Sequence, residues 1–414
     1  MRKWIRPAHV LGAVALAAPL ALLAPPAHAD VECDGHAATI VGTAGPDDLV
    51  GTPQNDVIAG LDGWDTIDGR GGADVICGDD GRDHLHGGRG DDRLYGGLDG
   101  LSTDRGDEPV VVGDVVYGGP GDDLFDGGLD DRARVQRPDE ISYATAGRRV
   151  SASLATLSAR GQGRDRFTAQ TWRLVGSPYG DYLEGTALAD VIEGGGGDDL
   201  LNGRAGDDVL TPDNRRGPQD ADIVRAGPGD DRVQSFAGRD RVFGGGGADG
   251  LYDWGARGAD RLVGGPGDDY LLDVLVDRAR QGVTGGAGDD YVYLSSRIRR
   301  HGHPVRLHGT ADLRDGTATL RWRGGHRSFR LASAESLSVP AGAWTAYGTD
   351  AANRLETSGT GPLRLFGRAG DDLLLGSARD DVIDGGAGED TARPRTGKDT
   401  CTHVEKPGRC EVLR

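Results

Sequence analysis

The feature that most constrains this chain is an aspartate that returns every nine residues. Between Gly42 and Tyr95 these aspartates are Asp47, Asp56, Asp65, Asp74, Asp83 and Asp92. A large aliphatic residue follows each of them two positions later: Leu49, Ile58, Ile67, Ile76, Leu85 and Leu94. A Gly/Asp-rich disordered linker would not require this second residue. The period therefore predicts one structural unit stacked on itself, a solenoid.

The full form of the unit is G-G-x-G-x-D-x-U-x, where U is a large aliphatic residue, as in Gly87–Tyr95. Glycines permit the positive φ angles of a tight turn whose carbonyl groups point inward. Calcium is bound by about six to eight hard oxygen atoms, and the aspartate adds a carboxylate to those carbonyls. The D-x-U-x segment predicts a short strand with U facing the core.

Two nonapeptides form one coil, so residues about eighteen positions apart are expected on the same side of the solenoid. This predicts two ladders of carboxylates. One ladder begins with Asp47, Asp65 and Asp83. The other begins with Asp56, Asp74 and Asp92. Each ion is expected between successive turns of one edge.

The unit recurs in the rest of the chain, and its aspartates are predicted calcium ligands with the first six. They are Asp123, Asp181, Asp190, Asp199, Asp208, Asp222, Asp231, Asp240, Asp249, Asp260, Asp269, Asp290, Asp372, Asp381 and Asp390. Asn353 occupies the aspartate position at the start of the last stretch, and Asp399 ends it. Large apolar residues occupy the U position until the end of the chain, where the smaller Ala392 and Cys401 take their place. This change is expected of a terminal capping coil.

This nonapeptide is similar to the calcium-binding repeat of RTX, or haemolysin-type, proteins. The resemblance implies an all-β fold, a parallel β-roll or β-helix solenoid that holds several Ca2+ ions. Many RTX proteins leave the cell through a dedicated exporter that reads an uncleaved C-terminal signal, and the N-terminal signal expected here departs from that pattern.

Interruptions of the period predict the domain organisation, with about eleven coils in three arrays. A first repeat array covers 30–131, a β insert 132–175, a second array 176–293, a second insert 294–347, and a third array with a disulfide-capped tail 348–414. Residues 99–117 and 131–138 are interpreted as polar excursions. The alternation in Val150–Leu154 and Thr317–Arg323 predicts antiparallel strands, exposed hairpins in the first case.

The chain carries a formal charge of −19, which disfavours nucleic acid or an anionic membrane as a partner. Its N-terminus has the form of an export signal. Three basic residues, Arg2, Lys3 and Arg6, precede the apolar stretch Val10–Leu23 and the small-residue site Ala27–Ala29. We expect cleavage before Asp30 and a secreted, extracellular protein. A membrane anchor is the alternative, but the apolar stretch is short for a span, and no other segment suits one.

Four cysteines in an exported chain suggest disulfides, and four allow three connectivities. The positions favour local pairs, Cys33 with Cys77 and Cys401 with Cys410, one near each end of the solenoid. Free structural thiols are the alternative.

The sequence contains no H-E-x-x-H or G-x-S-x-G motif, and its longest non-repeat stretch is 294–347. We therefore expect no catalytic residues and no enzyme. Paired carboxylates such as Asp91 and Asp92 belong to the repeat. His84 and His86 share one strand face and could bind a transition metal, although a solvated pair is the simpler interpretation. The basic patch Arg297–His301 could contact an acidic glycan, although a solvated strand end is the simpler interpretation.

These patterns predict a secreted calcium-binding protein whose β-roll folds on binding Ca2+ and serves as an extracellular binding or structural scaffold. The candidate partner besides calcium is an extracellular glycan or a cell surface. The alternatives are a calcium-dependent polysaccharide-modifying enzyme and an adhesin component.

Overall fold

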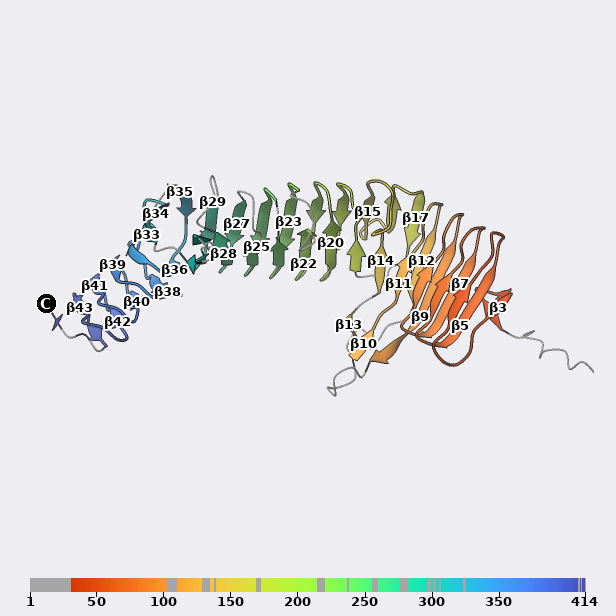
Figure 1. Cartoon of the computed structure of the whole chain (residues 1–414), viewed down its shortest axis with the longest axis horizontal. Helices are drawn as coiled ribbons and strands as arrows, with labels where there is room; N and C mark the ends of the chain where they lie inside the picture. Colours follow the sequence, from red (N-terminus) through yellow and green to blue (C-terminus); the bar gives the residue numbers. More distant parts are fainter. Residues whose placement is uncertain are drawn as a thin grey trace, which may run out of the picture.

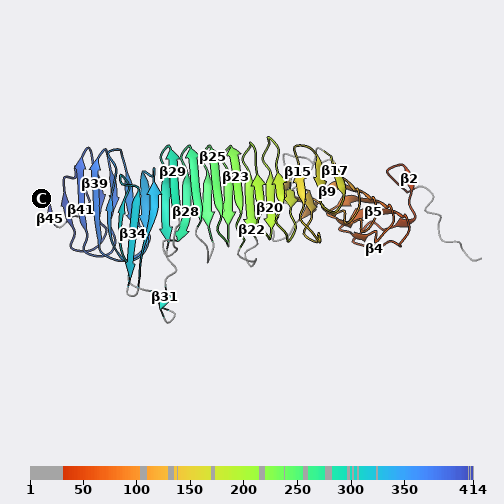
Figure 2. The same cartoon turned by 90° about the horizontal axis from the view of Figure 1, so that it is seen from above.

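The protein is a long, bent rod of stacked β-strands with its ends far apart (Figures 1 and 2). The structure, a computed structural model, describes residues 31–102, 110–128, 135–137, 139–168, 173–213, 220–236, 238–254, 260–275, 282–295, 299–300, 303–304, 307–322, 325–408, 410 and 412–413. The predicted signal segment, 1–29, lies outside these residues. Within them the regular structure is entirely β.

Two sheets form the rod. Sheet 1 consists of β3 (Ile40–Val41), β5 (Val57–Gly63), β7 (Val75–Gly81), β9 (Arg93–Ser102), β10 (Val110–Val112), β12 (Leu124–Gly128), β13 (Val135–Arg137), β15 (Ser151–Ser153), β16 (Ser158–Arg160), β17 (Arg164–Phe167), β19 (Tyr182–Glu184), β21 (Leu200–Asn202), β23 (Ile223–Pro228), β25 (Arg241–Gly246), β27 (Arg261–Pro266), β29 (Gly282–Ala287), β33 (His308–Asp312), β34 (Thr317–Trp322), β35 (Gly325–Ala332), β37 (Ala343–Tyr347), β39 (Leu363–Ala369), β41 (Val382–Ala387), β43 (Thr400–Thr402) and β45 (Val412–Leu413).

Sheet 2 faces sheet 1 across the core. It consists of β4 (Asp48–Val50), β6 (Thr66–Asp68), β8 (His84–His86), β11 (Val115–Tyr117), β14 (Glu140–Ser142), β18 (Arg173–Val175), β20 (Val191–Gly195), β22 (Val209–Asp213), β24 (Arg232–Ser235), β26 (Gly250–Asp253), β28 (Tyr270–Leu275), β30 (Tyr291–Ser295), β36 (Ser336–Val339), β38 (Arg354–Thr357), β40 (Leu373–Leu375), β42 (Thr391–Arg393) and β44 (Lys406–Pro407). Two small hairpins stand apart, β1 (Glu32–Cys33) with β2 (His36–Ala37), and β31 (Arg299–Arg300) with β32 (His303–Pro304).

Each coil contributes one strand to each sheet, and strands of successive coils pair in parallel. Ile58 is opposite Ile76 in sheet 1, and Ile67 is opposite Leu85 in sheet 2. The register shift is eighteen residues, two nonapeptides, which confirms the parallel β-roll. Within the described residues sheet 2 has seventeen strands. The estimate of about eleven coils was therefore too low, because interrupted coils also complete a turn.

The core is a double column of the residues at the U position. The side chains of Ile58, Ile67, Leu183 and Leu262 are almost completely buried, and the pattern holds to Ala392 and Cys401. Their strand neighbours face outward, as Thr66 does beside Ile67. A strand of three residues can bury only one side chain in this way, since alternate residues point to opposite faces.

Both inserts contain antiparallel meanders, and both keep the rod continuous. In the first, β15, β16 and β17 pair antiparallel in that order. The last strand, β17, pairs in parallel with β12 of the preceding coil, and the first, β15, pairs in parallel with β19 of the next. The meander thus adds three strands to sheet 1 without interrupting it.

The second meander has the same topology. Strands β33, β34 and β35 pair antiparallel, with β35 parallel to β29 and β33 parallel to β37. Each meander returns the chain to sheet 2, through β18 in one case and β36 in the other. The three arrays consequently form one rod, a question that the repeat pattern left open.

Two expectations for the interruptions were wrong. Residues 99–117 are not simply a polar excursion, because β11 is a regular strand of sheet 2 between β8 and β14. Among the described residues of this stretch, the departure from the coil is the antiparallel pair β9–β10. The alternating residues Val150, Ala152 and Leu154 are buried in the core and not in an exposed hairpin, because their apolar side faces the interior of the roll.

The disulfides are those expected from the spacing. Cys33 pairs with Cys77, with Cα atoms 5.8 Å apart, and Cys401 pairs with Cys410, at 5.9 Å. The first joins the hairpin β1–β2 to β7, and the second joins β43 to the C-terminal tail. The described residues include no helix with the length and apolar character needed to cross a membrane.

Candidate calcium-binding turns

The repeat aspartates form two ladders that run along the edges of the rod. In each step one carboxylate oxygen, Oδ1, accepts a hydrogen bond from the backbone N–H of the aspartate one coil earlier. The N–H of Asp47 donates to Oδ1 of Asp65, and that of Asp65 to Oδ1 of Asp83, both at 2.8 Å. The other ladder repeats this from Asp56 to Asp74 and Asp92. The repeat aspartates thus lie in the two ladders expected from the period.

All of the predicted ligands except Asp47 are buried. Asp47 is half-buried because it lies in the first coil, which has no earlier coil to cover it. The structure brings the predicted residues of each array together in sequence order along the two edges. Whether each one binds calcium remains a prediction.

Three further aspartates belong to the ladders although the repeat pattern does not predict them. The N–H of Asp83 donates to Asp114 at 2.7 Å, and the N–H of Asp114 donates to Asp139 at 2.8 Å. On the other edge, the N–H of Asp123 donates to Asp165 at 3.3 Å. A signal was present, because each has an apolar residue two positions later: Val116, Ile141 and Phe167. The missing glycines and the long insertions hid it.

Glutamate ends two of the ladders. The Oε2 atom of Glu335 accepts from the N–H of Asp290 at 3.0 Å, and that of Glu405 from Asp390 at 2.8 Å. The longer side chain reaches the same N–H from a coil in which the nonapeptide has ended. These two residues have no counterpart in the motif, so the period could not identify them.

The second carboxylate oxygen, Oδ2, decides what each turn can bind. Among the described residues it is buried and has no hydrogen-bond partner in Asp65, Asp74, Asp83, Asp92, Asp123, Asp199, Asp208, Asp222, Asp231, Asp249, Asp269, Asp290, Asp372 and Asp390. Burying a charged oxygen without a partner is costly. A set this regular indicates that another group, such as a cation, completes these turns.

A glycine opens space beside this oxygen. An ideal Cβ atom on Gly60 would lie 2.5 Å from Oδ2 of Asp65 and 2.7 Å from the carbonyl oxygen of Gly78. Gly69 stands in the same relation to Asp74 and Gly87. Any side chain would therefore fill the place where a carboxylate of one coil and a carbonyl of the next converge.

The residue four positions before the aspartate has a positive φ angle in these turns. It is often glycine, as at Gly88 (φ 105°). Six turns hold a non-glycine residue in the same strained conformation, with φ between 70° and 84°: Leu61, Arg70, Asp79, Arg204, Arg368 and Arg395. A non-glycine residue in this region costs on the order of 1–3 kcal/mol, and such strain clusters at functional sites.

A second kind of turn has Thr or Ser at this position and is closed by hydrogen bonds. The N–H and Oγ1 of Thr52 both contact Oδ2 of Asp56, at 2.6 and 2.9 Å. Thr186 contacts Oδ2 of Asp190 in the same way, at 2.5 and 3.0 Å. In these hydroxyl-capped turns a protein donor occupies the oxygen that the glycine turns leave open.

The hydroxyl-capped turns stand where ladders begin. The capped pairs are Thr43–Asp47, Thr52–Asp56, Ser177–Asp181, Thr186–Asp190, Thr349–Asn353 and Ser377–Asp381. In each array they are the first acidic or amide positions on the two edges. The protein itself therefore supplies the donors that close the first turn of each edge.

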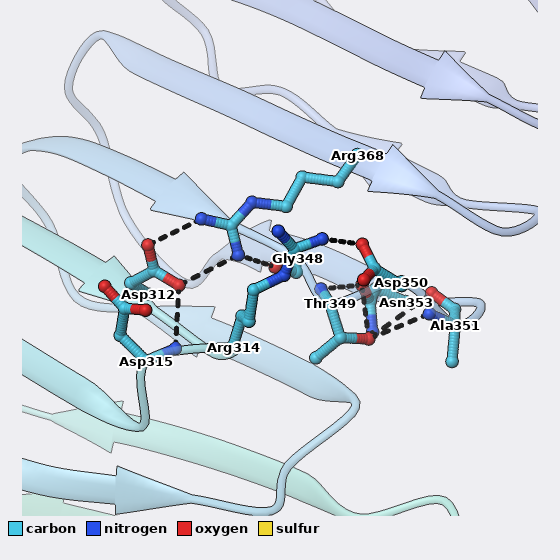
Figure 3. Close-up of polar contacts among 9 residues, drawn as sticks. All are labelled: Asp312, Arg314, Asp315, Gly348, Thr349, Asp350, Ala351, Asn353 and Arg368. Carbon is cyan, nitrogen blue, oxygen red and sulfur yellow. Dashed lines mark hydrogen bonds and ion pairs between the residues drawn. The ribbon is translucent and has the colours of Figure 1, made fainter.

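The start of the third array shows such a turn in detail (Figure 3). Oδ1 of Asn353 accepts the N–H of Thr349 at 2.6 Å. The guanidinium of Arg368 forms a bidentate pair with Asp312 and donates to the carbonyl oxygen of Gly348 at 2.6 Å. Here an amide takes the place of the carboxylate of an open turn, and the arginine donates to the carbonyl group that an open turn leaves free. The bidentate pair of Arg368 with Asp312 also links the second meander to the array.

The open turns are electrostatically unfavourable without a cation. Burial raises the pKa of Asp83 to about 7 and that of Asp123 to about 8, with neighbouring carboxylates adding to the effect and a backbone hydrogen bond opposing it. Burial and then the charge of Asp213 raise the pKa of Asp222 to about 9. Near neutral pH the ladder therefore favours either a bound proton or a bound cation.

These residues fit Ca2+. The open turns offer hard carboxylate and carbonyl oxygens, unpartnered and buried, which is the donor set that calcium prefers. Bound calcium would supply positive charge between coils and would thereby neutralise the ladders.

The other candidates lie away from the ladders. His84 and His86 flank the buried Leu85 on β8, and burial lowers the pKa of both imidazoles. Among the described residues the acidic clusters that could hold a metal contain no histidine. Of the basic patch, Arg297, Ile298 and His301 lie outside the described residues.

Comparison with known families agrees with this geometry. The model of the RTX calcium-binding nonapeptide repeat, which spans four copies of the unit, matches residues 41–76, 78–99, 113–132, 175–210, 219–251, 254–272, 283–296 and 366–401. A comparison with curated proteins gave no match. The matched stretches cover slightly more than half of the chain and include most of the ladder aspartates, although not Asp139 or Asp165. The chain is therefore a member of the RTX calcium-binding nonapeptide repeat family.

Proposed function

We propose that the protein is a secreted scaffold that folds outside the cell by binding Ca2+ in the open turns. The observation that carries this proposal is the set of buried, unpartnered Oδ2 atoms, all of which face glycine or positive-φ turns where the loop is described. An ion between two coils would join them through the carboxylate of one and the carbonyl of the other. Binding free energy then becomes folding free energy, since no such site exists in the unfolded chain.

The hydroxyl-capped turns would need no ion. Their oxygens already have protein donors, so the first coil of each edge can form by hydrogen bonding alone. Calcium-dependent folding would proceed from these coils into the open turns. The disulfide Cys33–Cys77 would hold the N-terminal end in place in the same way.

The signal-like N-terminus supports an extracellular location. Arg2, Lys3 and Arg6 before the apolar stretch Val10–Leu23 have the composition of a secretory signal. A chain that needs calcium for its fold would stay unfolded where calcium is scarce and fold after export, where both calcium and disulfide formation are available.

A row of aromatic residues on the outer face of sheet 2 supports a surface or glycan ligand. Tyr252 and Trp254 have nearly parallel rings 6.2 Å apart, and Tyr270 and Tyr291 lie 6.0 Å apart. Tyr270 is 55% exposed, and Arg232 lies over the ring of Tyr252. Exposed aromatic rings with polar tips suit an amphipathic ligand such as a carbohydrate chain.

The alternative, a polysaccharide-modifying enzyme, would need a groove that gathers polar side chains away from the ladders. A shallow groove of about 510 Å³ collects Asp68, Arg70, His86 and Tyr117. His86 and Tyr117 are stacked at 4.4 Å, and Arg70 belongs to the turn of Asp74. We infer a non-catalytic role for this groove, because its groups are engaged in packing the coils.

The first test of the proposal concerns folding. In a calcium chelator the mature chain should lose most of its far-UV β signal, and added Ca2+ should restore it cooperatively. Mg2+ should restore it poorly, because it demands tight octahedral geometry and keeps its waters. A full β signal in chelator would show that hydrogen bonds and disulfides hold the fold unaided, and the proposal would fail.

The pH dependence should have opposite signs with and without calcium. Without it, folded-state pKa values such as that of Asp199, raised to about 8 mainly by burial, exceed the usual 3.8. The folded state then binds more protons than the unfolded state, so stability should fall as pH rises from about 4 to about 8. With calcium the carboxylates must be ionised, and acid should destabilise the protein. Melting temperatures at about pH 5 and pH 8, with chelator and with calcium, check both signs.

The two kinds of turn should differ in calcium stoichiometry. Asp208→Asn removes a carboxylate from an open turn and should lose at least one bound Ca2+ in equilibrium dialysis. Asp190→Asn makes the same change one coil earlier, in a hydroxyl-capped turn, and should lose none. Its effect should be a loss of only about 1 kcal/mol, the difference between a hydrogen bond to a charged group and one to a neutral group, because Asn353 closes the equivalent turn with its amide oxygen. Equal calcium losses in the two variants would contradict the assignment.

The aromatic row can be tested by a glycan and cell-surface binding screen in calcium. Tyr270→Ala should reduce retention on a ligand that binds the wild-type chain by at least about fivefold, or about 1 kcal/mol, which only a minority of interface residues exceed. Tyr182→Ala removes an exposed tyrosine from sheet 1 and should bind normally. Equal loss in both variants would place the ligand elsewhere.

A further inference from the structure

One acidic residue lies against the ladder of the second array without belonging to the nonapeptide. Asp213 ends β22, and its register partner in the preceding coil is Gly195, so a carboxylate stands where the repeat has a turn glycine. Asp213, Asp222 and Asp240 are all buried. One carboxylate oxygen of each lies within 4.8 Å of the other two.

The hydrogen bonds of this cluster leave one buried oxygen without a partner. Oδ1 of Asp222 accepts the N–H of Asp199 at 2.8 Å, but its Oδ2 has no partner although the residue is only 1% exposed. Asp240 accepts the N–H of Asp222 at 3.1 Å and the hydroxyl of Ser235. Asp213 accepts the N–H of Phe236 at 3.3 Å.

The three carboxylates place like charges close together in a buried site. Within the described part of the chain neither Asp222 nor Asp240 forms an ion pair with a basic side chain. Like charges this close repel strongly when they are buried. Ca2+–oxygen distances are about 2.3–2.6 Å, so one ion can bridge oxygens up to about 5 Å apart.

We propose that Asp213, Asp222 and Asp240 together hold one Ca2+ ion in a three-carboxylate site that the nonapeptide motif does not encode. The inference rests on the proposed calcium function and adds to it a ligand from outside the repeat. Calcium affinity rises with the number of charged ligands and with the rigidity of the site. This site is therefore the first of the second array to fill as calcium rises, and it orders the middle of the rod before the other open turns.

A natural reporter lies beside the site. The backbone N–H of Trp254 donates to the carbonyl oxygen of Ser235 at 2.9 Å, and the hydroxyl of Ser235 contacts Asp240. Terbium(III), a calcium substitute with oxygen ligands, emits light when a nearby indole is excited. Emission that disappears in Trp254→Phe reports on this site, and emission that persists comes from other turns.

The experiment is a terbium titration of the mature chain, combined with calcium equilibrium dialysis. Asp213→Gly restores the residue of the preceding coil, and Asp213→Asn keeps the shape of the side chain. Both should lose the Trp254-dependent emission at low terbium, bind one Ca2+ fewer, and weaken the tightest site by at least about tenfold, as loss of a ligand group does. Asp230→Asn removes the same charge from an exposed turn position and should behave as the wild type.

Unchanged stoichiometry and emission in both Asp213 variants would overturn the inference. Failure of both variants to fold in saturating calcium would also overturn it, because the loss of one ion among many should not prevent folding. A wild-type chain that binds no calcium would instead overturn the proposed function. The two failures are thus separable in one set of measurements.

Discussion

The structure depends on a ladder of buried carboxylates of like charge. Each aspartate uses one oxygen to accept the N–H of the coil before it, which fixes the register of the two coils. The same bond directs the other oxygen toward the glycine of its own turn. The contact that stacks the coils therefore also builds a row of buried carboxylates, which favours a bound proton or cation between the coils.

The ends of the ladders are closed by protein groups. At the start of each array Thr or Ser replaces the positive-φ residue and closes the turn with two hydrogen bonds. At the end of two ladders a glutamate reaches the last free N–H. The disulfides hold the outermost coils, where a solenoid frays first. The turns at the ladder ends are thus closed by protein donors and acceptors, whereas the turns inside the ladders leave a carboxylate oxygen open.

The two meanders show how a solenoid accepts insertions. In each, the last antiparallel strand pairs with the preceding coil and the first pairs with the next, so sheet 1 gains three strands without an exposed edge. Sheet 2 continues past both meanders with one strand per coil. An insertion of this form breaks the period of the sequence but not the pairing of the sheets. Bidentate contact between Asp312 and Arg368 then fastens the second meander to the array that follows.

The sequence by itself determined the coil, the core and most of the ladder. A period of nine with an aliphatic residue after each aspartate is compatible with only one stacking, since residues eighteen apart must coincide. The tertiary structure decided the rest. Asp114, Asp139 and Asp165 join the ladder across gaps of 31, 25 and 42 residues. Whether a turn is capped by a hydroxyl group, and whether Asp213 lies near the ladder, depends on where the carboxylate oxygens point in the folded chain. The separation of two residues in the sequence predicts which coils they belong to only while the repeat is unbroken. Beyond an insertion, the backbone hydrogen bonds between coils decide which residues meet.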